Sequence, residues 1–325
     1  MKRREFITFL GGAAATWPLT VRAQEQRRVI GVLSSAGFGA YAGAEAAFIQ
    51  GLKDTGFIEG KNINIEWRWG EGQYNRLSSL AGELAARNVS VISTFDLPSA
   101  LAAKATTKTI PIVFATGADP VKLGLVDSLS QPRGNLTGVS TVVSALTPKQ
   151  LELLHEILPS AGTIVLLVNA SNPNAKVDAL EEQTAANVLG QRLEVLTAST
   201  DGDLEAAFTT MVERRANALI VKADPFFYDR REPLVALAAR HAMPAIYPSR
   251  FFTEIGGLAS YGIPIVDLYH QVGTYTGKIL SGAKPADLPI YQPVRFELVI
   301  NLKTAKALGI EVPMHLQQLA DDVIE

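Results

Sequence analysis

The chain alternates strand-like and helix-like segments twice over, and this repetition constrains its fold more than any other feature. In the first half the apolar run Val29–Leu33 precedes a helical pattern over Ala44–Thr55, which ends at Gly56 in the position of a C-terminal cap. In the second half Thr163–Val168 begins the same order, and the matching cap is Gly190. Because strand–helix–strand units form parallel sheets with right-handed crossovers, the sequence predicts an α/β protein with two doubly wound parallel-sheet lobes.

The other expected elements follow the same alternation. Ile63–Trp69 alternates apolar and polar residues, which is typical of a half-exposed edge strand. Ligands of doubly wound sheets bind at the carboxyl ends of the strands, so two such edges facing each other would enclose one cleft. Further strands are expected over 89–93, 111–115, 192–197, 218–221 and 244–247, and further helices over 77–87, 98–107, 175–189, 204–214 and 231–241.

The N-terminal residues have the organisation of a secretory signal peptide. Residues 2–4 are basic, Phe6–Leu19 is mostly apolar, and Val21 and Ala23 are small residues at a cleavage site near Ala23. The arginine pair ahead of an apolar residue also resembles a twin-arginine export signal, and an uncleaved N-terminal helix is the alternative. Residues 1–23 are therefore expected to direct the protein to the periplasm.

The composition excludes several classes of function. The formal net charge is −2 and no cluster of lysine and arginine follows the N-terminus, so no nucleic-acid partner is expected. The chain has no cysteine, which rules out disulfides, thiol catalysis and thiolate metal sites. Its histidines are scattered, and neither a G-x-S-x-G nor a P-loop motif is present. We therefore expect no metal and no cofactor.

The turn after the first strand does not match a dinucleotide-binding fingerprint. Its glycines, Gly37, Gly39 and Gly43, are spaced one residue too long for G-x-G-x-x-G, and two serines precede them. Hydroxyl groups and free backbone N–H groups at such a turn suit an anion, and a carboxylate in particular. Ser34 and Ser35 either bind a ligand carboxylate or cap the following helix.

The candidate ligand-binding residues all lie at or just after expected strands, where both lobes would face the cleft. They are polar, glycine or aromatic, which suits a small polar ligand with a flat apolar part. In chain order they are Ser34, Ser35, Thr94, Phe95, Thr116, Gly117, Asn169, Asp224, Phe226, Tyr228, Tyr247 and Tyr261.

Several of these residues have a structural alternative that the sequence leaves open. Asp224, beside Phe226 and Tyr228, either receives a ligand ammonium group in an aromatic box or caps the helix that follows. Phe95 either stacks on a ligand ring or fills the core of its own lobe. The residues from Thr116 onward are compatible both with a ligand-binding loop and with a plain turn.

A series of segments along the mature chain resembles one protein family. Over residues 27–325 the sequence is similar to the periplasmic substrate-binding proteins of ABC transporters, specifically the tryptophan/tyrosine-type family. The resemblance implies a type I periplasmic binding protein fold, three crossovers between the lobes, export, and capture of a small solute for a membrane permease. The segments read RVIGVLSS from Arg28, GLKDTGFIEG from Gly51, WGEGQYNRL from Trp69, TIPIVF from Thr109, GNLTGVS from Gly134, ADPFF from Ala223, PAIYP from Pro244 and FELVINLKTAK from Phe296.

The three crossovers divide the chain into lobes. We expect hinges near Val139–Ala145, Gly262–Val266 and Gln292–Phe296, with a hinge role also for Asn135–Gly138 just before the first crossover. The first lobe would then comprise 28–141 and about 264–295, to which Tyr269–Leu280 returns as a helix. The second lobe would comprise 142–263 and about 296–325, although the docking of 296–325 stays open.

We therefore expect an extracytoplasmic solute-binding protein of an ABC importer, with a Venus-flytrap fold that closes on a small carboxylate-bearing solute. The solute would be an amino acid or an aromatic acid. The resemblance does not fix which of them it is, because members of the family differ in ligand. The partners would be this solute and the ABC permease subunits, with the protein a monomer and not an enzyme. The alternatives are a ligand-sensing receptor domain of the same fold, and an enzyme using Asp96 and Asp224 as its catalytic pair.

Overall fold

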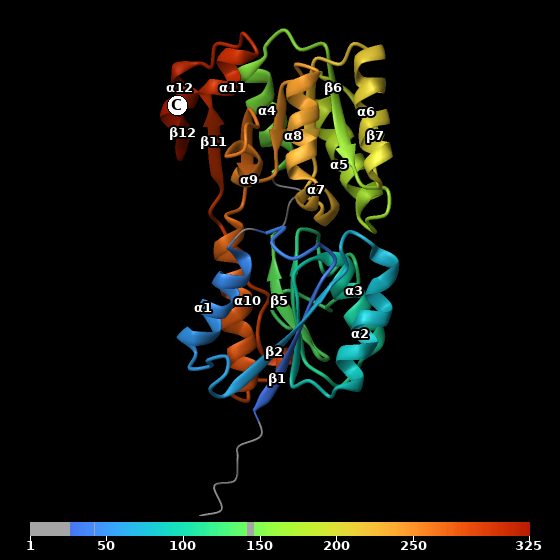
Figure 1. Cartoon of the computed structure of the whole chain (residues 1–325), viewed down its shortest axis with the longest axis vertical. Helices are drawn as coiled ribbons and strands as arrows, with labels where there is room; N and C mark the ends of the chain where they lie inside the picture. The colour runs from blue at the N-terminus through green and yellow to red at the C-terminus, as the bar shows by residue number, and fades with distance from the viewer. Residues whose placement is uncertain (1–26, 42, 142–145) are drawn as a thin grey trace, which may run out of the picture.

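The computed structural model of the protein describes residues 27–41, 43–141 and 146–325. These residues form two lobes stacked along the long axis of the molecule (Figure 1), each built on one sheet. The expected signal peptide, 1–23, and residues 142–145 of the first expected hinge lie outside the described residues. Within those ranges, no helix combines the length and the apolar character that a membrane span requires.

The first lobe holds a five-stranded sheet in which every pair of neighbouring strands is parallel. The strand order is β2-β1-β3-β4-β5, so β1 lies inside the sheet and β2 at an edge. β1 is mostly buried and β2 is partly exposed, which explains the apolar run in one strand and the alternation in the other. The strands are β1 Arg28–Ser34, β2 Ile63–Trp69, β3 Val91–Thr94, β4 Ile112–Thr116 and β5 Leu136–Ser140.

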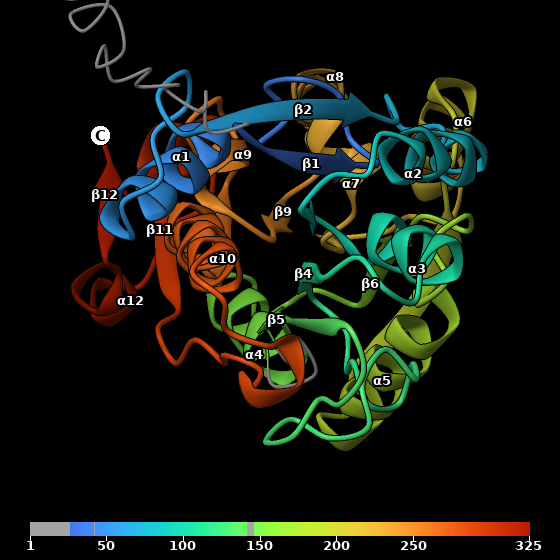
Figure 2. The ribbon, with the colours of Figure 1, turned by 90° about the horizontal axis from the view of Figure 1, so that it is seen from below.

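Helices cover both faces of this sheet, and one of them comes from far along the chain. α1 and α10 pack together on one face, and α2 and α3 cover the other (Figure 2). A Cβ atom at Gly273 in α10 would lie 2.1 Å from the carbonyl oxygen of Phe48 in α1, so this crossing requires glycine. The helices are α1 Ala44–Asp54, α2 Leu77–Ala86, α3 Leu97–Thr106 and α10 Ile265–Leu280.

The second lobe holds a seven-stranded sheet with the order β12-β11-β10-β9-β8-β6-β7. Its strands are parallel from β10 to β7, as expected, but β11 pairs antiparallel with β10. The chain enters β11 from the first lobe, across the cleft, and therefore runs opposite to strands whose carboxyl ends face that cleft. The strands are β6 Thr163–Val168, β7 Arg192–Thr197, β8 Ala218–Val221, β9 Ala245–Tyr247, β10 Ala259–Gly262, β11 Glu297–Asn301 and β12 Asp322–Ile324.

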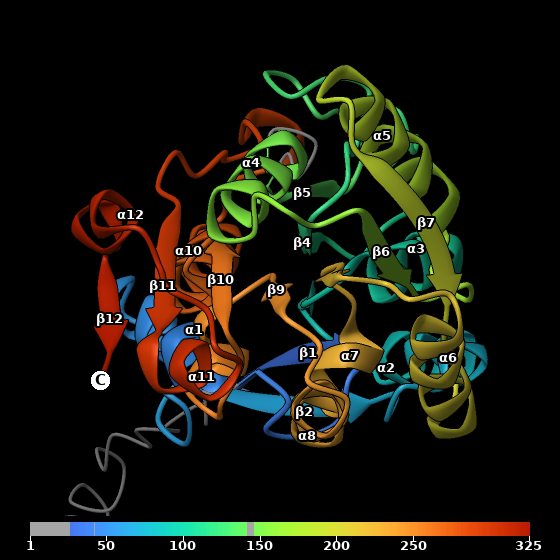
Figure 3. The same ribbon diagram turned by 90° about the horizontal axis from the view of Figure 1, so that it is seen from above.

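The helices of the second lobe also form two layers. α4 and α5 lie on one face of the sheet, and α6 and α8 on the other (Figure 3). Short helices α7 and α9 follow β8 and β9 at the cleft edge. The bounds are α4 Thr147–Ile157, α5 Ala175–Val188, α6 Asp201–Glu213, α7 Pro225–Asp229, α8 Arg231–Arg240, α9 Arg250–Thr253, α11 Leu302–Ala307 and α12 Met314–Leu319, with 3₁₀ turns at Tyr74–Arg76 and Pro285–Asp287.

Two segments beside the cleft form regular secondary structure. In the segment Asn135–Gly138, for which a hinge role was expected, residues 136–138 form the start of the fully buried strand β5. A Cβ atom at Gly138 would lie 2.0 Å from the carbonyl oxygen of Phe114, so the glycine reflects close strand packing and not a flexible joint. After β8, Asp224 is followed by helix α7, whose first residue is Pro225, so the helix required by the capping alternative is present.

Candidate ligand-binding site

A cavity of about 130 Å³ lies between the two lobes, at the carboxyl ends of both sheets. The first lobe lines it with residues that follow β1, β3, β4 and β5 and with the start of α10. The second lobe contributes residues that follow β6, β8, β9 and β10, together with side chains of α4 and α5. This is the place that the strand polarity predicts for a ligand of a doubly wound sheet.

One wall of the cavity is aromatic and is shared by the two lobes. The ring of Tyr41 lies 4.9 Å from the ring of Tyr228 and 5.5 Å from that of Tyr269, between ring centroids. Phe95 lies 4.3 Å from Tyr269, and all four rings are buried. Tyr228 belongs to the second lobe and the others to the first. Such a wall suits a flat apolar group on a ligand.

Asp224 caps the helix that follows it and also lines the cavity. Its Oδ1 accepts hydrogen bonds from the Tyr74 hydroxyl at 2.8 Å, from Asn169 Nδ2 at 2.9 Å and from the backbone N–H of Phe226 at 2.9 Å, the last of which caps α7. Its Oδ2 accepts from Asn172 Nδ2 at 2.7 Å. The carboxyl group lines the cavity, and burial raises its pKa despite these donors.

The expected carboxylate site at Ser34 and Ser35 exists, but the protein's own Asp96 occupies it. Asp96 Oδ2 accepts from the backbone N–H of Ser35 at 2.8 Å and from the Ser34 hydroxyl at 3.3 Å, while Oδ1 caps α3 through Ser99. Both serines are fully buried, and neither lines the cavity. The Ser34 hydroxyl and the Ser35 N–H are therefore already engaged, and Asp96 itself faces the cavity.

Half of the expected site residues line the cavity. Thr116 and Gly117 follow β4, and Tyr261 ends β10 on the opposite lobe. The Thr116 hydroxyl accepts from the backbone N–H of Ala118 at 3.0 Å, and so retains its own proton for a ligand oxygen. The expected residues that line the cavity are Phe95, Thr116, Gly117, Asp224, Tyr228 and Tyr261.

The remaining expected residues lie behind the cavity. Thr94 is the buried last residue of β3, and Phe226 packs under the Arg230 guanidinium, 4.9 Å from the ring centroid. Tyr247 stacks on a neighbouring phenylalanine in the core of its lobe. Asn169 does not line the cavity, but it holds Asp224 in place. With Ser34 and Ser35, these four are structural neighbours of the site.

Several polar residues at the site were not predicted from the sequence. Tyr74 lies in a 3₁₀ turn after the edge strand, with no strand-end pattern to mark it. Asn172 follows β6 and lines the cavity, but it was not among the predicted site residues. Lys222 and Asp178 line the cavity, and Lys222 Nζ forms a buried ion pair with Glu182 Oε1 at 2.9 Å. Lys222 follows β8 directly and Asp178 lies on α5, so the two become neighbours only through tertiary packing.

Asp178 should make the protein less stable as the pH rises. Burial raises its pKa from 3.8 to about 6, so the folded protein holds a proton that the unfolded chain releases between these values. We expect the unfolding free energy of the wild type, relative to Asp178→Asn, to fall by about 2 kcal/mol between pH 4.5 and 7.5. Urea denaturation of both proteins at the two pH values measures this difference.

An exposed aspartate provides the control for this titration. Backbone N–H donation from Ser199 lowers the pKa of Asp203, so its contribution should have the opposite sign. Relative to Asp203→Asn, the wild type should gain stability as the pH rises through the acid range. If the unfolding free energy of the wild type relative to Asp178→Asn changes with pH in the same direction as that relative to Asp203→Asn, the Asp178 carboxyl is not desolvated as described.

Within the described residues, no group of three or more histidine, aspartate or glutamate side chains is arranged to hold a metal ion. The cavity is lined by aspartate carboxylates, amides, hydroxyl groups, aromatic rings and one lysine.

Two α/β lobes with a shared cavity at their strand ends define a solute-binding protein with the type I periplasmic binding protein fold. Residues 30–324 match the model of the family described as ABC transporter substrate binding protein. The chain therefore belongs to the ABC transporter substrate-binding protein family, as its motifs suggested. Members of this family bind small solutes and work with ABC permeases.

Characterised relatives include binders of aromatic amino acids. The tyrosine-binding protein of Clostridioides difficile (strain R20291) is 30% identical over 272 residues, which cover 82% of this chain and 77% of that protein. An ABC domain in complex with L-Trp from Streptococcus pneumonia has a TM-score of 0.85 at 27% identity, over 92% of this chain and 100% of that one. A ligand-free, open substrate-binding protein from Clostridium difficile has a TM-score of 0.66 at 28% identity, over 92% of this chain and 99% of that one.

Proposed function

We propose that the protein is an extracytoplasmic receptor that captures an aromatic amino acid by closing its two lobes and presents it to an ABC importer. The observation that carries this proposal is the buried Asp224 carboxylate beside an aromatic wall to which both lobes contribute. The names of the tyrosine-binding relative and of the L-Trp complex agree with this chemistry.

The charges around the cavity favour a ligand with an amine. The acidic side chains among its described lining residues are Asp96, Asp178 and Asp224, and the basic one is Lys222, which is already paired with Glu182. A buried carboxylate is stabilised by an opposite charge, and a ligand ammonium group at Asp224 Oδ2 would supply one. A solute with only carboxylates would add to the negative charge.

The ligand carboxylate is assigned to the turn after β4. Thr116 retains a hydroxyl proton, and Gly117 brings bare backbone to the cavity wall. This turn belongs to the first lobe and Asp224 to the second, so an amino acid held at both points would bridge the lobes. Its side chain would then pack against Tyr41 and Tyr228.

Hinge closure is supported by the comparison of the two relatives. At nearly equal identity and coverage, the TM-score is 0.85 with the L-Trp complex and 0.66 with the ligand-free, open structure. A rotation of one lobe relative to the other accounts for such a difference. We place the hinges near 139–145, 262–266 and 292–296. The lobes are then 28–141 with about 264–295, and 142–263 with about 296–325.

Export and assembly complete the proposal. A signal peptide over 1–23 would deliver the mature protein to the periplasm, where it acts as a monomer that hands its solute to the permease. An enzymatic role for Asp96 and Asp224 has no support, because both carboxylates accept the hydrogen bonds that cap α3 and α7.

A panel of matched ligands tests this function. We expect isothermal titration calorimetry to detect L-tyrosine and L-tryptophan, and to show at least tenfold weaker binding of 3-(4-hydroxyphenyl)propionate, which lacks only the amine of tyrosine. The expected loss reflects a charge-assisted hydrogen bond at a buried carboxylate. Glutamate serves as an amino acid without a ring. Tighter binding of the plain acid than of tyrosine would overturn the proposed ligand class.

A further inference from the structure

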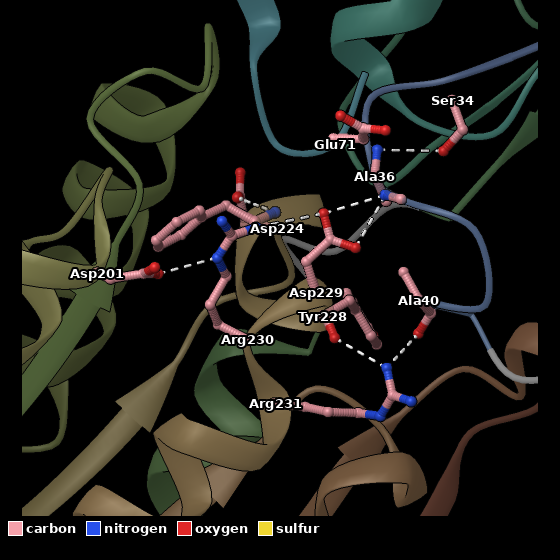
Figure 4. A network of polar contacts seen from close by, with 12 residues as sticks. Ser34, Ala36, Ala40, Glu71, Asp201, Asp224, Tyr228, Asp229, Arg230 and Arg231 are labelled. Atoms are coloured by element: carbon pink, nitrogen blue, oxygen red, sulfur yellow. Dashed lines mark hydrogen bonds and ion pairs between the residues drawn. The ribbon is translucent and has the colours of Figure 1, made fainter. Parts of the chain in front are cut away.

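The segment around α7 joins the two lobes directly, outside the cavity. We define the α7 latch as Asp229 and Arg231 of the second lobe with Gly37 and Ala40 of the first. Figure 4 shows Asp229 and Arg231 reaching the loop that carries Ala36 and Ala40. None of these contacts uses an atom of a ligand.

Asp229 forms one half of the latch. Its Oδ1 and Oδ2 accept from the backbone N–H of Gly37 at 2.8 and 3.1 Å. A Cβ atom at Gly37 would lie 3.2 Å from Asp229 Oδ1, so glycine allows this approach. Arg230 Nη1 lies 3.6 Å from Asp229 Oδ2, and Arg230 Nε forms an ion pair with Asp201 Oδ1 at 3.0 Å.

Arg231 forms the other half. Its Nη1 donates to the carbonyl oxygen of Ala40 at 2.9 Å and to that of Tyr228 in its own lobe at 3.0 Å. One guanidinium nitrogen thus ties the loop after β1 to the end of α7. Tyr41, the next residue along that loop, contacts the Tyr228 ring, so the latch is continuous with the aromatic wall.

We propose that the α7 latch stabilises the closed arrangement of the lobes before any solute binds, so that part of the free protein is already closed. The inference rests on the proposed hinge closure but not on the identity of the solute. Apparent affinity scales with the population of the competent conformation, so loss of the latch should weaken every ligand by the same factor. A change at Asp224, by contrast, should discriminate between ligands with and without an amine.

The test measures lobe separation in the ligand-free protein. The chain has no cysteine, so Ser79→Cys on α2 and Thr209→Cys on α6 introduce two labelling sites, one exposed on each lobe. Single-molecule energy transfer between the labels should show a closed population without ligand. In Asp229→Ala/Arg231→Ala the ratio of closed to open molecules should fall at least tenfold, while saturating L-tyrosine still closes the lobes.

Asp201→Ala is the matched control, because it alters the same network without touching the first lobe, and it should retain most of the closed population. Circular dichroism melts confirm that each variant folds. An unchanged distribution in the double variant would overturn the latch, as would a ligand-free wild type with no closed population. The comparison of ligand-free molecules uses no solute, so it can overturn the latch while the proposed ligand class stands. Equally, the ligand panel can overturn the ligand class while the latch stands.

Discussion

Replacing Asp224 by asparagine is expected to weaken binding of L-tyrosine or L-tryptophan about 100-fold, which corresponds to about 2.7 kcal/mol. Asparagine retains an oxygen that can cap α7 and accept from Tyr74, but it carries no charge. The substitution therefore removes the attraction to a ligand ammonium group with little change in shape. Calorimetric titration of the variant with each amino acid measures the loss.

Two comparisons distinguish a charge effect from a folding effect. The 3-(4-hydroxyphenyl)propionate probe has no amine and should lose little affinity, or gain some, when the negative charge at Asp224 is removed. Asp203→Asn alters a capping aspartate of the same lobe that does not line the cavity, and it should leave binding unchanged. Equal losses for the amino acid and the plain acid would refute the ammonium role of Asp224.

Replacing Gly273 by alanine is expected to destabilise the protein by about 3 kcal/mol, at the upper end of what overpacking costs. The new methyl group would lie 2.1 Å from the carbonyl oxygen of Phe48, and backbone cannot move aside as a flexible side chain can. α10 must then separate from α1, which opens the core of the first lobe. The shift of the urea midpoint, at an unchanged slope, measures the loss.

Gly82→Ala on α2 is the matched control for this substitution. A Cβ atom at Gly82 meets no atom within 4 Å, and the position is inside a helix. Alanine there should raise stability slightly, by about 0.5–1 kcal/mol, through helix propensity alone. If Gly273→Ala is as mild as Gly82→Ala, α10 does not pack against α1 as described.

Much of the fold could be predicted because its strands are short apolar runs between clear helix patterns. β6, β7 and β8 begin and end at the expected residues, and the glycines after α1 and α5 have the positive φ of C-terminal caps. The antiparallel strand β11 could not be predicted, since its direction depends on where the chain re-enters the second lobe. β5 was missed because a glycine inside a strand resembles a loop.

The candidate site was predictable only as far as strand ends reveal it. Asp224 lies three residues after the end of β8, and both of its proposed roles are compatible with the structure. Ser34 and Ser35 also end a strand, but no local pattern shows that Asp96 will take their donors. Tyr74 reaches Asp224 from the other lobe, so its role depends on how the lobes meet and not on its neighbours in sequence.

The most direct test of lobe closure on an aromatic amino acid is small-angle X-ray scattering of the mature protein with and without L-tyrosine. We predict a smaller radius of gyration when tyrosine is saturating, and no such decrease with the plain acid at the same concentration. Calorimetry must first confirm that the same sample binds tyrosine. An identical radius of gyration with and without bound tyrosine in that sample would contradict closure.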